Sequence, residues 1–219
     1  LTSSDGTHNV VFSVYPGFVL VQQGELNPVL AGYLDFPPNE SHGWMPFIVA
    51  DPFNARAFYF CGSRLHHGSW LSGDNVHYNP SSQDFTVYGG DYLTALGIAP
   101  SDPQRRVAVV NNGRIWYSVD GGTQWTVSGS LGPSAHYFYG TAIVHHASDP
   151  QRAWIGGSGY GGYPVWRTAD GGVEVEGGGA EPLEPFDPGG GNHRRIVGAV
   201  VEGREQQVDA PFDQCRDLL

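Results

Sequence analysis

An Asp-Pro pair that returns at a regular interval constrains the fold of this chain more than any other feature. The pairs begin at Asp51, Asp102 and Asp149, so they recur after 51 and then 47 residues. A short apolar segment precedes each pair, over 45–50, 93–99 and 140–146. Proline presets φ in a turn and the aspartate side chain can accept amide protons two residues on. Each pair is therefore predicted to connect two strands of a hairpin.

The segments between these pairs have the character of short β-strands. They are rich in β-branched and aromatic residues, are bounded by Gly, Pro, Asn and Asp, and show no apolar stripe of helical period. The clearest are 10–15, 18–22, 57–61, 106–110, 115–118 and 141–145. A period near 50 residues with four short strands per unit is typical of propeller blades. The sequence predicts an all-β fold, a partial β-propeller of about three to four four-stranded antiparallel blades, at approximately 1–40, 41–90, 91–138 and 139–172.

Residues 173–219 differ from the rest in composition. They hold 4 Arg against 10 acidic residues, and only two of the 28 aromatic residues, Phe186 and Phe212. A segment so acidic and so poor in large apolar groups cannot bury enough surface to offset its chain entropy. We expect an irregular, acidic Gly/Pro-rich tail. Because a one-base slip near Val173 would restore a Trp, we also hypothesise that this tail is a non-native extension.

Charge and composition argue against several partners. The formal net charge is −11 and the eleven basic residues are all Arg, scattered singly or in pairs, whereas nucleic acid and anionic membranes need clustered positive charge. No apolar run approaches the roughly 20 residues of a membrane-spanning helix. We therefore expect neither nucleic-acid binding nor membrane insertion.

Metal and cofactor sites are not expected either. The two cysteines, Cys61 and Cys215, are too few for a thiolate zinc site, and adjacent histidines such as His66 and His67 point to opposite faces of a strand. The segment 157–162 matches a dinucleotide fingerprint by letter, but strand-forming residues follow it, so no helix N-terminus would meet a pyrophosphate. We predict no metal and no cofactor.

A second motif repeats in step with the Asp-Pro pairs. Residues 118–125 read Ser-Val-Asp-Gly-Gly-Thr-Gln-Trp, which fits Ser/Thr-x-Asp-x-Gly-x-x-Trp, and residues 168–172 fit it up to the Gly, with Val175 in place of the Trp. Segments 68–74 and 3–7 are decayed candidates. The aspartate can accept turn amides, Gly supplies positive φ, the hydroxyl ties the entering strand, and the Trp packs over the corner. The residues given this structural role are Ser118, Asp120, Gly122, Trp125, Thr168, Asp170 and Gly172.

With these two motifs, residues 44–172 resemble the Asp-box (BNR-repeat) β-propellers. That group includes sialidases, xyloglucanase-type glycoside hydrolases, the sortilin ectodomain and photosystem assembly factors. The resemblance implies a secreted or periplasmic protein. Because these propellers have more blades than this chain supplies, it also implies further blades in a longer parent chain.

In a four-stranded meander, the first-to-second and third-to-fourth turns lie at one end, so the ligand face of the resembled enzymes corresponds to the other end. The loops expected there are 35–44, 79–92, 111–114, 128–139 and 158–163. Their candidate catalytic acids are Asp35, Glu40, Asp84 and Asp91. The candidate ligand-binding rings are Trp44, Tyr88, Tyr92, His136, Tyr137, Tyr139 and Tyr160.

Rings beside carboxylates suit carbohydrate, so the leading hypothesis is a module that recognises glycan or protein on this face. The first alternative is a glycoside hydrolase of sialidase-like or xyloglucanase-like type, which needs two facing carboxylates about 5–5.5 Å or 6.5–9.5 Å apart. A sialidase is disfavoured, because the Arg-Ile-Pro signature is absent and Arg114 is the only Arg in the loops named. The remaining alternative is a structural or assembly propeller.

Overall fold

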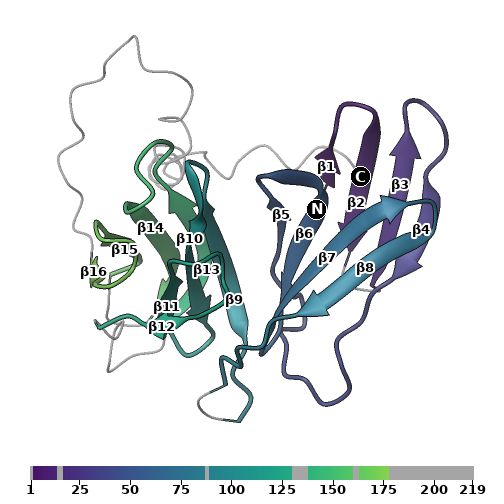
Figure 1. Ribbon diagram of the computed structural model, residues 1–219. Helices are drawn as coiled ribbons and strands as arrows, with labels where there is room; N and C mark the ends of the chain where they lie inside the picture. The colour runs from purple at the N-terminus through teal and green to yellow at the C-terminus, as the bar shows by residue number, and fades with distance from the viewer. Residues whose placement is uncertain (1, 14–16, 87–88, 130–137, 160–162, 178–219) are drawn as a thin grey trace, which may run out of the picture. The chain divides into compact units, whose positions relative to one another are not determined.

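The computed structural model describes residues 2–13, 17–86, 89–129, 138–159 and 163–177. These residues form sixteen strands in four sheets, and each sheet contains four consecutive antiparallel strands (Figure 1). The first sheet contains β1 (Thr2–Ser4), β2 (His8–Ser13), β3 (Phe18–Gln23) and β4 (Val29–Tyr33). The second contains β5 (Ile48–Asp51), β6 (Asn54–Cys61), β7 (Leu65–Ser72) and β8 (Asn75–Pro80). The third contains β9 (Leu93–Ala99), β10 (Asp102–Val110), β11 (Ile115–Ser118) and β12 (Thr126–Val127). The fourth contains β13 (Phe138–His145), β14 (Ala153–Gly159), β15 (Val165–Thr168) and β16 (Glu176–Gly177).

The predicted fold class is confirmed, since each sheet is a simple meander and the described residues contain no helix. The fourth sheet runs beyond the expected limit of 172. Its last strand pairs Glu176 with Arg167, and Val175 before it is only 4% exposed. The short side chain of Val175 thus occupies a buried place even though it lacks the bulk of a Trp. Residues 178–219, where the rest of the tail was expected, lie outside the described residues.

Consecutive sheets pack face to face through apolar side chains. Between the first two sheets, Phe12 of β2 stacks on Phe58 of β6 with ring centroids 3.8 Å apart. Both rings are almost completely buried. Because burial of a Phe side chain contributes about 1.5–3 kcal/mol, contacts of this kind dominate the stability of the interface.

The third sheet packs against both of its neighbours. Leu96 and Ala108 join the core shared with the second sheet, whereas Val107 and Val109 join the core shared with the fourth. This division follows from the alternation of side chains along a strand. At the second of these interfaces Gly140 of β13 lies against Val109, and a Cβ on Gly140 would come within 2.5 Å of that side chain. Glycine at this position therefore allows the two sheets to approach closely.

The turn between the first and second strands has the same construction in all four sheets. In each, an aspartate Oδ1 accepts the backbone N–H two residues later. The pairs are Asp5 with Thr7 (2.8 Å), Asp51 with Phe53 (2.8 Å), Asp102 with Gln104 (2.9 Å) and Asp149 with Gln151 (3.1 Å). Segment 3–7, interpreted from the sequence as a decayed copy of the Ser/Thr-x-Asp motif, therefore belongs to the Asp-turn series. The repeat is fourfold although only three copies keep the Pro.

Asp5 also links the first sheet to the second. Its carboxylate pairs with Arg56 at 2.7 Å, and the Arg56 guanidinium lies over the Trp70 ring at 4.8 Å. Hydrogen bonds from the His8 and Thr7 amides, followed by the bond from Arg56, hold the pKa of Asp5 well below its usual range. The first Asp turn therefore ties two neighbouring sheets together as well as closing its hairpin.

The Ser/Thr-Asp-Gly turns at 118–125 and 168–175 join the third and fourth strands of their sheets and share one hydrogen-bond network. Ser118 Oγ donates to Asp120 Oδ1 (2.9 Å) and accepts from the Gly122 amide (2.9 Å). Thr168, Asp170 and Gly172 repeat these bonds at the same two distances. Gly122 and Gly172 have φ of 86° and 100°, a region that favours glycine.

These turns lie beside the Asp turns. The Gly121 amide donates to the Gln104 carbonyl at 3.0 Å and the Gly171 amide to the Gln151 carbonyl at 2.7 Å. The first-to-second and third-to-fourth turns of the third and fourth sheets therefore occupy the same end, as the meander topology predicts.

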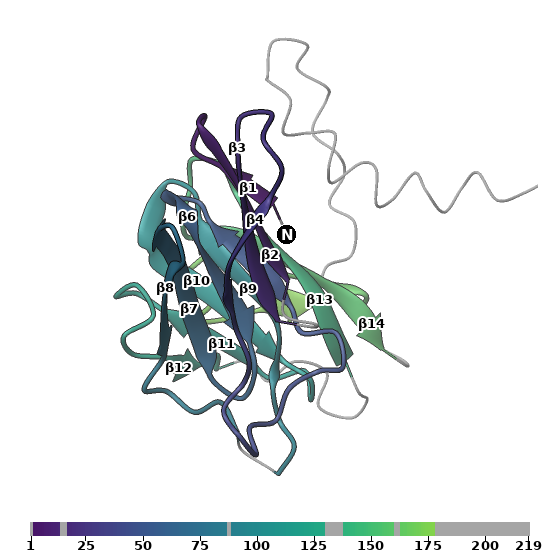
Figure 2. The same ribbon diagram turned by 90° about the vertical axis from the view of Figure 1, so that its right-hand side faces the viewer.

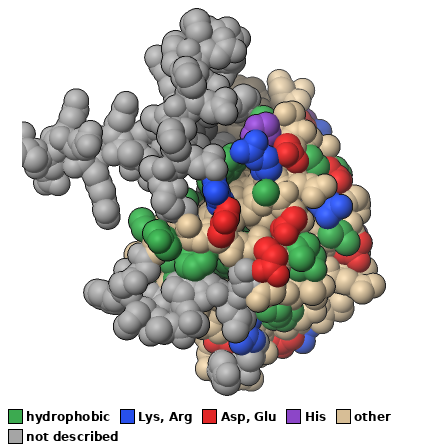
Figure 3. Space-filling model, turned by 90° about the vertical axis from the view of Figure 1, so that its left-hand side faces the viewer, with side chains coloured by type: hydrophobic (Ala, Val, Ile, Leu, Met, Phe, Trp, Pro, Cys, Tyr) green, Lys and Arg blue, Asp and Glu red, His purple; other side chains and the backbone are tan. Residues whose placement is uncertain are grey.

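Among the described residues, none belongs to a helix that is long and apolar enough to cross a membrane. Figure 3 shows acidic and basic side chains interleaved on the side of the molecule where β15 and β16 lie. Arg167 of β15 and Glu176 of β16 form an ion pair at 2.8 Å.

Replacement of Ser118 by Ala should lower the free energy of unfolding by about 1–2 kcal/mol, because it removes the acceptor of the Gly122 amide in a buried turn. Thr168→Val should have an effect of the same size, since it removes the equivalent acceptor with little change in shape. Urea denaturation measures both values. The control is Thr126→Val on an exposed position of β12. Equal stability of the Ser118 variant and this control would contradict the assigned role of the turn.

Stability should fall as pH decreases below about 6.5, and His145 should contribute to that loss. Burial lowers the pKa of His145 from 6.5, and neither ring nitrogen has a hydrogen-bond partner of good geometry among the described residues. The unfolded chain then binds more protons than the folded chain at pH below 6.5, so protonation favours unfolding. Urea denaturation at pH 7.5 and 5.5 should show a smaller difference for His145→Leu than for the unmodified chain. Some difference should persist, because burial also lowers the pKa of His67. An unchanged difference would exclude His145 as a contributor.

Candidate functional site

Three segments meet at the opposite end of the first two sheets from the Asp turns. They are the β4–β5 connection, the β6–β7 turn and the β8–β9 connection, whose long loops lie together at the bottom of Figures 1 and 2. Backbone hydrogen bonds hold them together. The Ser63 amide donates to Ser41 (2.7 Å), and the Phe85 amide donates to Ser63 (2.9 Å). The second sheet thus serves as the base on which the two long connections are fixed.

These segments surround an open groove with a volume of about 400 Å³. Its lining residues are Pro37, Pro38, Asn39, Glu40, Ser63, Arg64, Pro80 and Asp84. Three of the eight lining residues are prolines, and the other five are polar or charged. The groove contains two carboxylates and one guanidinium, and no aromatic side chain lines it within the described part of the chain.

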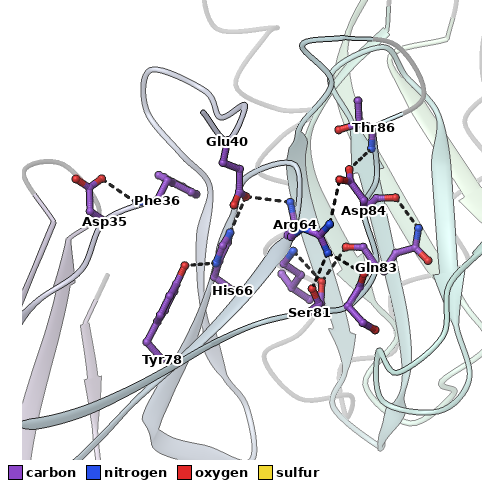
Figure 4. Close-up of polar contacts among 12 residues, drawn as sticks. Asp35, Phe36, Glu40, Arg64, His66, Tyr78, Ser81, Gln83, Asp84 and Thr86 are labelled. Carbon is purple, nitrogen blue, oxygen red and sulfur yellow. Dashed lines mark hydrogen bonds and ion pairs between the residues drawn. The ribbon is translucent and has the colours of Figure 1, made fainter. Parts of the chain in front are cut away.

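Glu40 is held in the groove by a buried histidine. Glu40 Oε1 lies 2.6 Å from Nε2 of His66 and also accepts the Arg64 amide at 3.1 Å (Figure 4). On the other side of the imidazole, the Tyr78 hydroxyl lies 2.5 Å from Nδ1. Because a carboxylate only accepts, Nε2 carries the proton, and in the Nε2–H tautomer the ring accepts the Tyr78 proton at Nδ1. Tyr78, His66 and Glu40 form one continuous relay.

The His66 ring is fixed by packing as well as by hydrogen bonds. Its side chain is completely buried, and that of Glu40 is only 6% exposed. The imidazole is stacked between Phe60 and Tyr78, with centroid distances of 4.7 and 5.3 Å, and Phe36 meets it edge-on. Rings on several sides leave His66 one orientation, so the direction of Glu40 is preset.

Asp84 is held by Arg64 from the other side of the groove. Arg64 Nη2 lies 3.3 Å from Asp84 Oδ2, and Nη1 donates to the carbonyls of Ser81 (3.2 Å) and Ser82 (2.8 Å). Partial burial acts to raise the pKa of Asp84, but hydrogen bonds from Thr86 and the charge of Arg64 outweigh it and lower the pKa. Asp84 is therefore an ionised and oriented acceptor.

The local electrostatics around the relay are negative. Burial raises the pKa of Tyr78 to about 12, and the charges of Glu40 and Asp35 add to the increase. Tyr78 therefore stays protonated and can donate to His66 throughout the neutral range.

Of the four candidate acids, the structure brings Glu40 and Asp84 together in one groove. Asp35 is exposed and its carboxylate accepts the amide of the next residue, Phe36, at 2.8 Å. Asp91 is buried and accepts from Asn112 Nδ2 at 3.1 Å. Neither Asp35 nor Asp91 lines the groove.

The candidate aromatic residues do not gather in the groove. Trp44 is 78% exposed in the β4–β5 connection, the half-buried Tyr92 ring lies against Gly43, and Tyr139 is in β13 opposite Ser158. The expectation that Tyr139 belongs to a loop is therefore corrected, because β13 begins at Phe138. The remaining candidate rings, Tyr88, His136, Tyr137 and Tyr160, lie outside the described residues.

Arg64, His66 and Tyr78 were missed from the sequence. The loops considered there omitted the β6–β7 turn, so Arg114 was taken as the only Arg in the loops. The His66-His67 pair was examined only for metal binding. His66 faces Phe60 and Tyr78, whereas His67 packs on Tyr59. A usable signal was present, since the alternation that separates the two histidines also predicts that one of them faces the core.

No protein-family model and no curated protein sequence matches this chain. Several solved structures, however, match this chain. YCF48 from Cyanidioschyzon merolae matches with a TM-score of 0.50 and 16% identity over 72% of this chain and 47% of that protein. A protein from Lactobacillus plantarum matches with a TM-score of 0.52 and 14% identity over 78% of this chain and 53% of that one. The four sheets are blades of a β-propeller.

A looser likeness, with a TM-score of 0.45 and 15% identity, relates 80% of this chain to 29% of the GH74 enzyme of Niastella koreensis. Identities this low establish the fold alone. This chain spans about half the length of YCF48 and of the Lactobacillus plantarum protein.

Tyr78→Phe should lower the free energy of unfolding by about 1–3 kcal/mol, because it leaves the buried Nδ1 of His66 without a donor. Tyr33→Phe is the control, since Tyr33 is 78% exposed on β4. Urea denaturation at pH 7.5 compares the two. Equal stability of both variants would show that the hydrogen bond from Tyr78 has no net effect.

Proposed function

We propose that this chain is a recognition module of an Asp-box β-propeller, and that the groove around Glu40 and Asp84 is its ligand site. One observation carries the proposal: two carboxylates in one groove are each held in place by a dedicated partner, Glu40 by His66 and Asp84 by Arg64. Orientation of polar groups in advance reduces the ordering cost of binding. A groove built in this way suits recognition.

The Asp-box assignment rests on the turns at 118–125 and 168–175. Ser118, Asp120 and Gly122 share their hydrogen bonds with Thr168, Asp170 and Gly172. Trp125 closes the first turn, since its indole N–H donates to the Gly122 carbonyl at 3.0 Å. We assign these residues a structural role, because they lie with the Asp turns and away from the groove.

The ligand is a glycan or a protein presented outside the cytoplasm. This placement follows from the resemblance to extracellular Asp-box propellers, as does the proposal that further blades belong to a longer parent chain. Loops at one end of a rigid scaffold are the common location of binding residues. The groove is formed by such loops on the first two blades.

Glycoside hydrolysis is the second candidate, because Glu40 and Asp84 share one groove with Arg64 between them. A pair of carboxylates is the usual catalytic device of glycosidases. His66 and Arg64 would then serve to position the two acids. A purely structural or assembly role is the remaining alternative.

Screening the 219-residue chain against a glycan array, tiled peptide arrays and fluorogenic glycosides should give binding without turnover. Loss of one hydrogen bond to a charged group costs about 1.5–3 kcal/mol, so Glu40→Gln and Asp84→Asn should each weaken binding roughly 10- to 100-fold. The matched controls are Glu25→Gln and Asp74→Asn, which change the same charges on exposed positions elsewhere.

Turnover that both groove variants abolish would instead favour the hydrolase. Binding that is equally strong in groove and control variants would move the ligand site away from this groove. If no glycan or peptide binds and no glycoside is cleaved, the assembly role would replace recognition.

A further inference from the structure

We infer that the groove accepts a basic side chain, lysine or arginine, of a protein segment. This inference rests on the proposed recognition function and specifies its ligand. It depends on which atoms of the groove remain available, on the net charge of the groove and on the chemistry of its walls.

Glu40 has one oxygen in use and one available. Oε1 receives both His66 and the Arg64 amide, whereas Oε2 has no hydrogen-bond partner among the described residues. The side chain is 6% exposed and lines the groove. Because Glu40 lines the groove, a donor supplied by a ligand can reach this oxygen and form a charge-assisted hydrogen bond with it.

Arg64 does not compete for that role. Three hydrogen bonds from its guanidinium go to the Ser81 and Ser82 carbonyls and to Asp84, while its backbone amide already binds Oε1. Much of the donor capacity of Arg64 is thus used within the protein, whereas the two carboxylates of the groove can accept further hydrogen bonds. A ligand group rich in donors, such as an ammonium or guanidinium, matches this imbalance.

The charge of the site points the same way. Glu40 and Asp84 outweigh Arg64 by one negative charge, and Asp35 lies near enough to contribute to the raised pKa of Tyr78. A cation is attracted to such a groove, whereas an anion is repelled.

The walls favour a peptide over a sugar. Pro37, Pro38 and Pro80 offer apolar surface on which the methylene stem of a lysine or arginine can lie while its charged end reaches Glu40. Sugar rings are commonly bound by stacking on aromatic rings, and the described lining residues include none. Trp44 and Tyr92, the rings expected from the sequence, lie outside the lining.

His66 is the positioning residue for this contact. Through Nε2 it holds Oε1, and this leaves Oε2 for the ligand (Figure 4). Tyr78 donates to Nδ1 and so keeps the imidazole in the Nε2–H tautomer. The relay thus presents one oriented, ionised oxygen at the base of the groove.

The test uses the 219-residue chain and fluorescent peptides with the sequence Gly-Ser-Arg-Ser-Gly, with citrulline or norleucine in place of Arg in matched peptides. Citrulline has nearly the same shape as arginine and no charge. Fluorescence polarisation should show at least about tenfold tighter binding of the Arg peptide. Glu40→Gln should remove this preference, and Glu25→Gln on an exposed turn should leave it unchanged.

A second readout does not depend on any ligand. Nitrogen-15 NMR of His66 should report the neutral Nε2–H tautomer at pH 7.5, and Tyr78→Phe should alter the Nδ1 signal. A doubly protonated ring or the other tautomer would overturn the relay, whatever the binding results.

The outcomes separate this inference from the proposed function. If a neutral glycan binds in a manner that Glu40→Gln and Asp84→Asn weaken, the recognition function stands and the basic-peptide ligand is wrong. Equal affinity for Arg and citrulline peptides also overturns it. If peptides or glycans bind but do not respond to the groove variants, the ligand site lies elsewhere and this inference fails, and if nothing binds, the recognition function itself fails.

Discussion

Packing of one sheet face against the next is the interaction on which the rest of this structure depends. A short four-stranded meander cannot bury its apolar side chains alone, so each sheet needs a neighbour on both faces. The third sheet shows the consequence, since Val107 and Val109 join one core while Ala108 joins the other. Close approach also requires small residues, such as Gly140 opposite Val109. Because both faces of a sheet are used for packing, side chains are free to vary mainly at the two ends of the sheets.

The two ends have different physical characters. At one end, an aspartate closes the first turn of every sheet, and Ser/Thr-Asp-Gly networks close the third turn in the last two sheets. These bonds are local, within four residues, and fix hairpin geometry. At the other end, the contacts join segments far apart in the sequence, as when Glu40 meets His66. Local hydrogen bonds can fix the geometry of a single turn, whereas long-range contacts can assemble a groove from several loops.

The relay through Tyr78, His66 and Glu40 shows how a polar group can be buried at acceptable cost. The completely buried His66 has a partner on each nitrogen and rings on several of its sides. By contrast, within the described part of the chain the nitrogens of buried His145 have no hydrogen-bond partner of good geometry. His66 has its hydrogen bonds satisfied and orients the Glu40 carboxylate, whereas His145 makes the stability of the fold depend on pH. Burial alone does not distinguish them; the surrounding donors and acceptors do.

The sequence alone determined the fold class, because turn chemistry and strand character are local properties that repeat near every 50 residues. Asp51, Asp102 and Asp149 revealed the repeat, whereas Asp5, which has no Pro after it, was assigned to the other motif. The burial of Val175 could not be predicted, because its neighbours in the sequence are acidic. Only part of the candidate site could be predicted from the sequence. Glu40 and Asp84 were identified by loop position, whereas Arg64, His66 and Tyr78 were not. Only the tertiary structure decided which acids share a groove, because hydrogen bonds across 26 residues, such as that from His66 to Glu40, leave no periodic trace in a single chain.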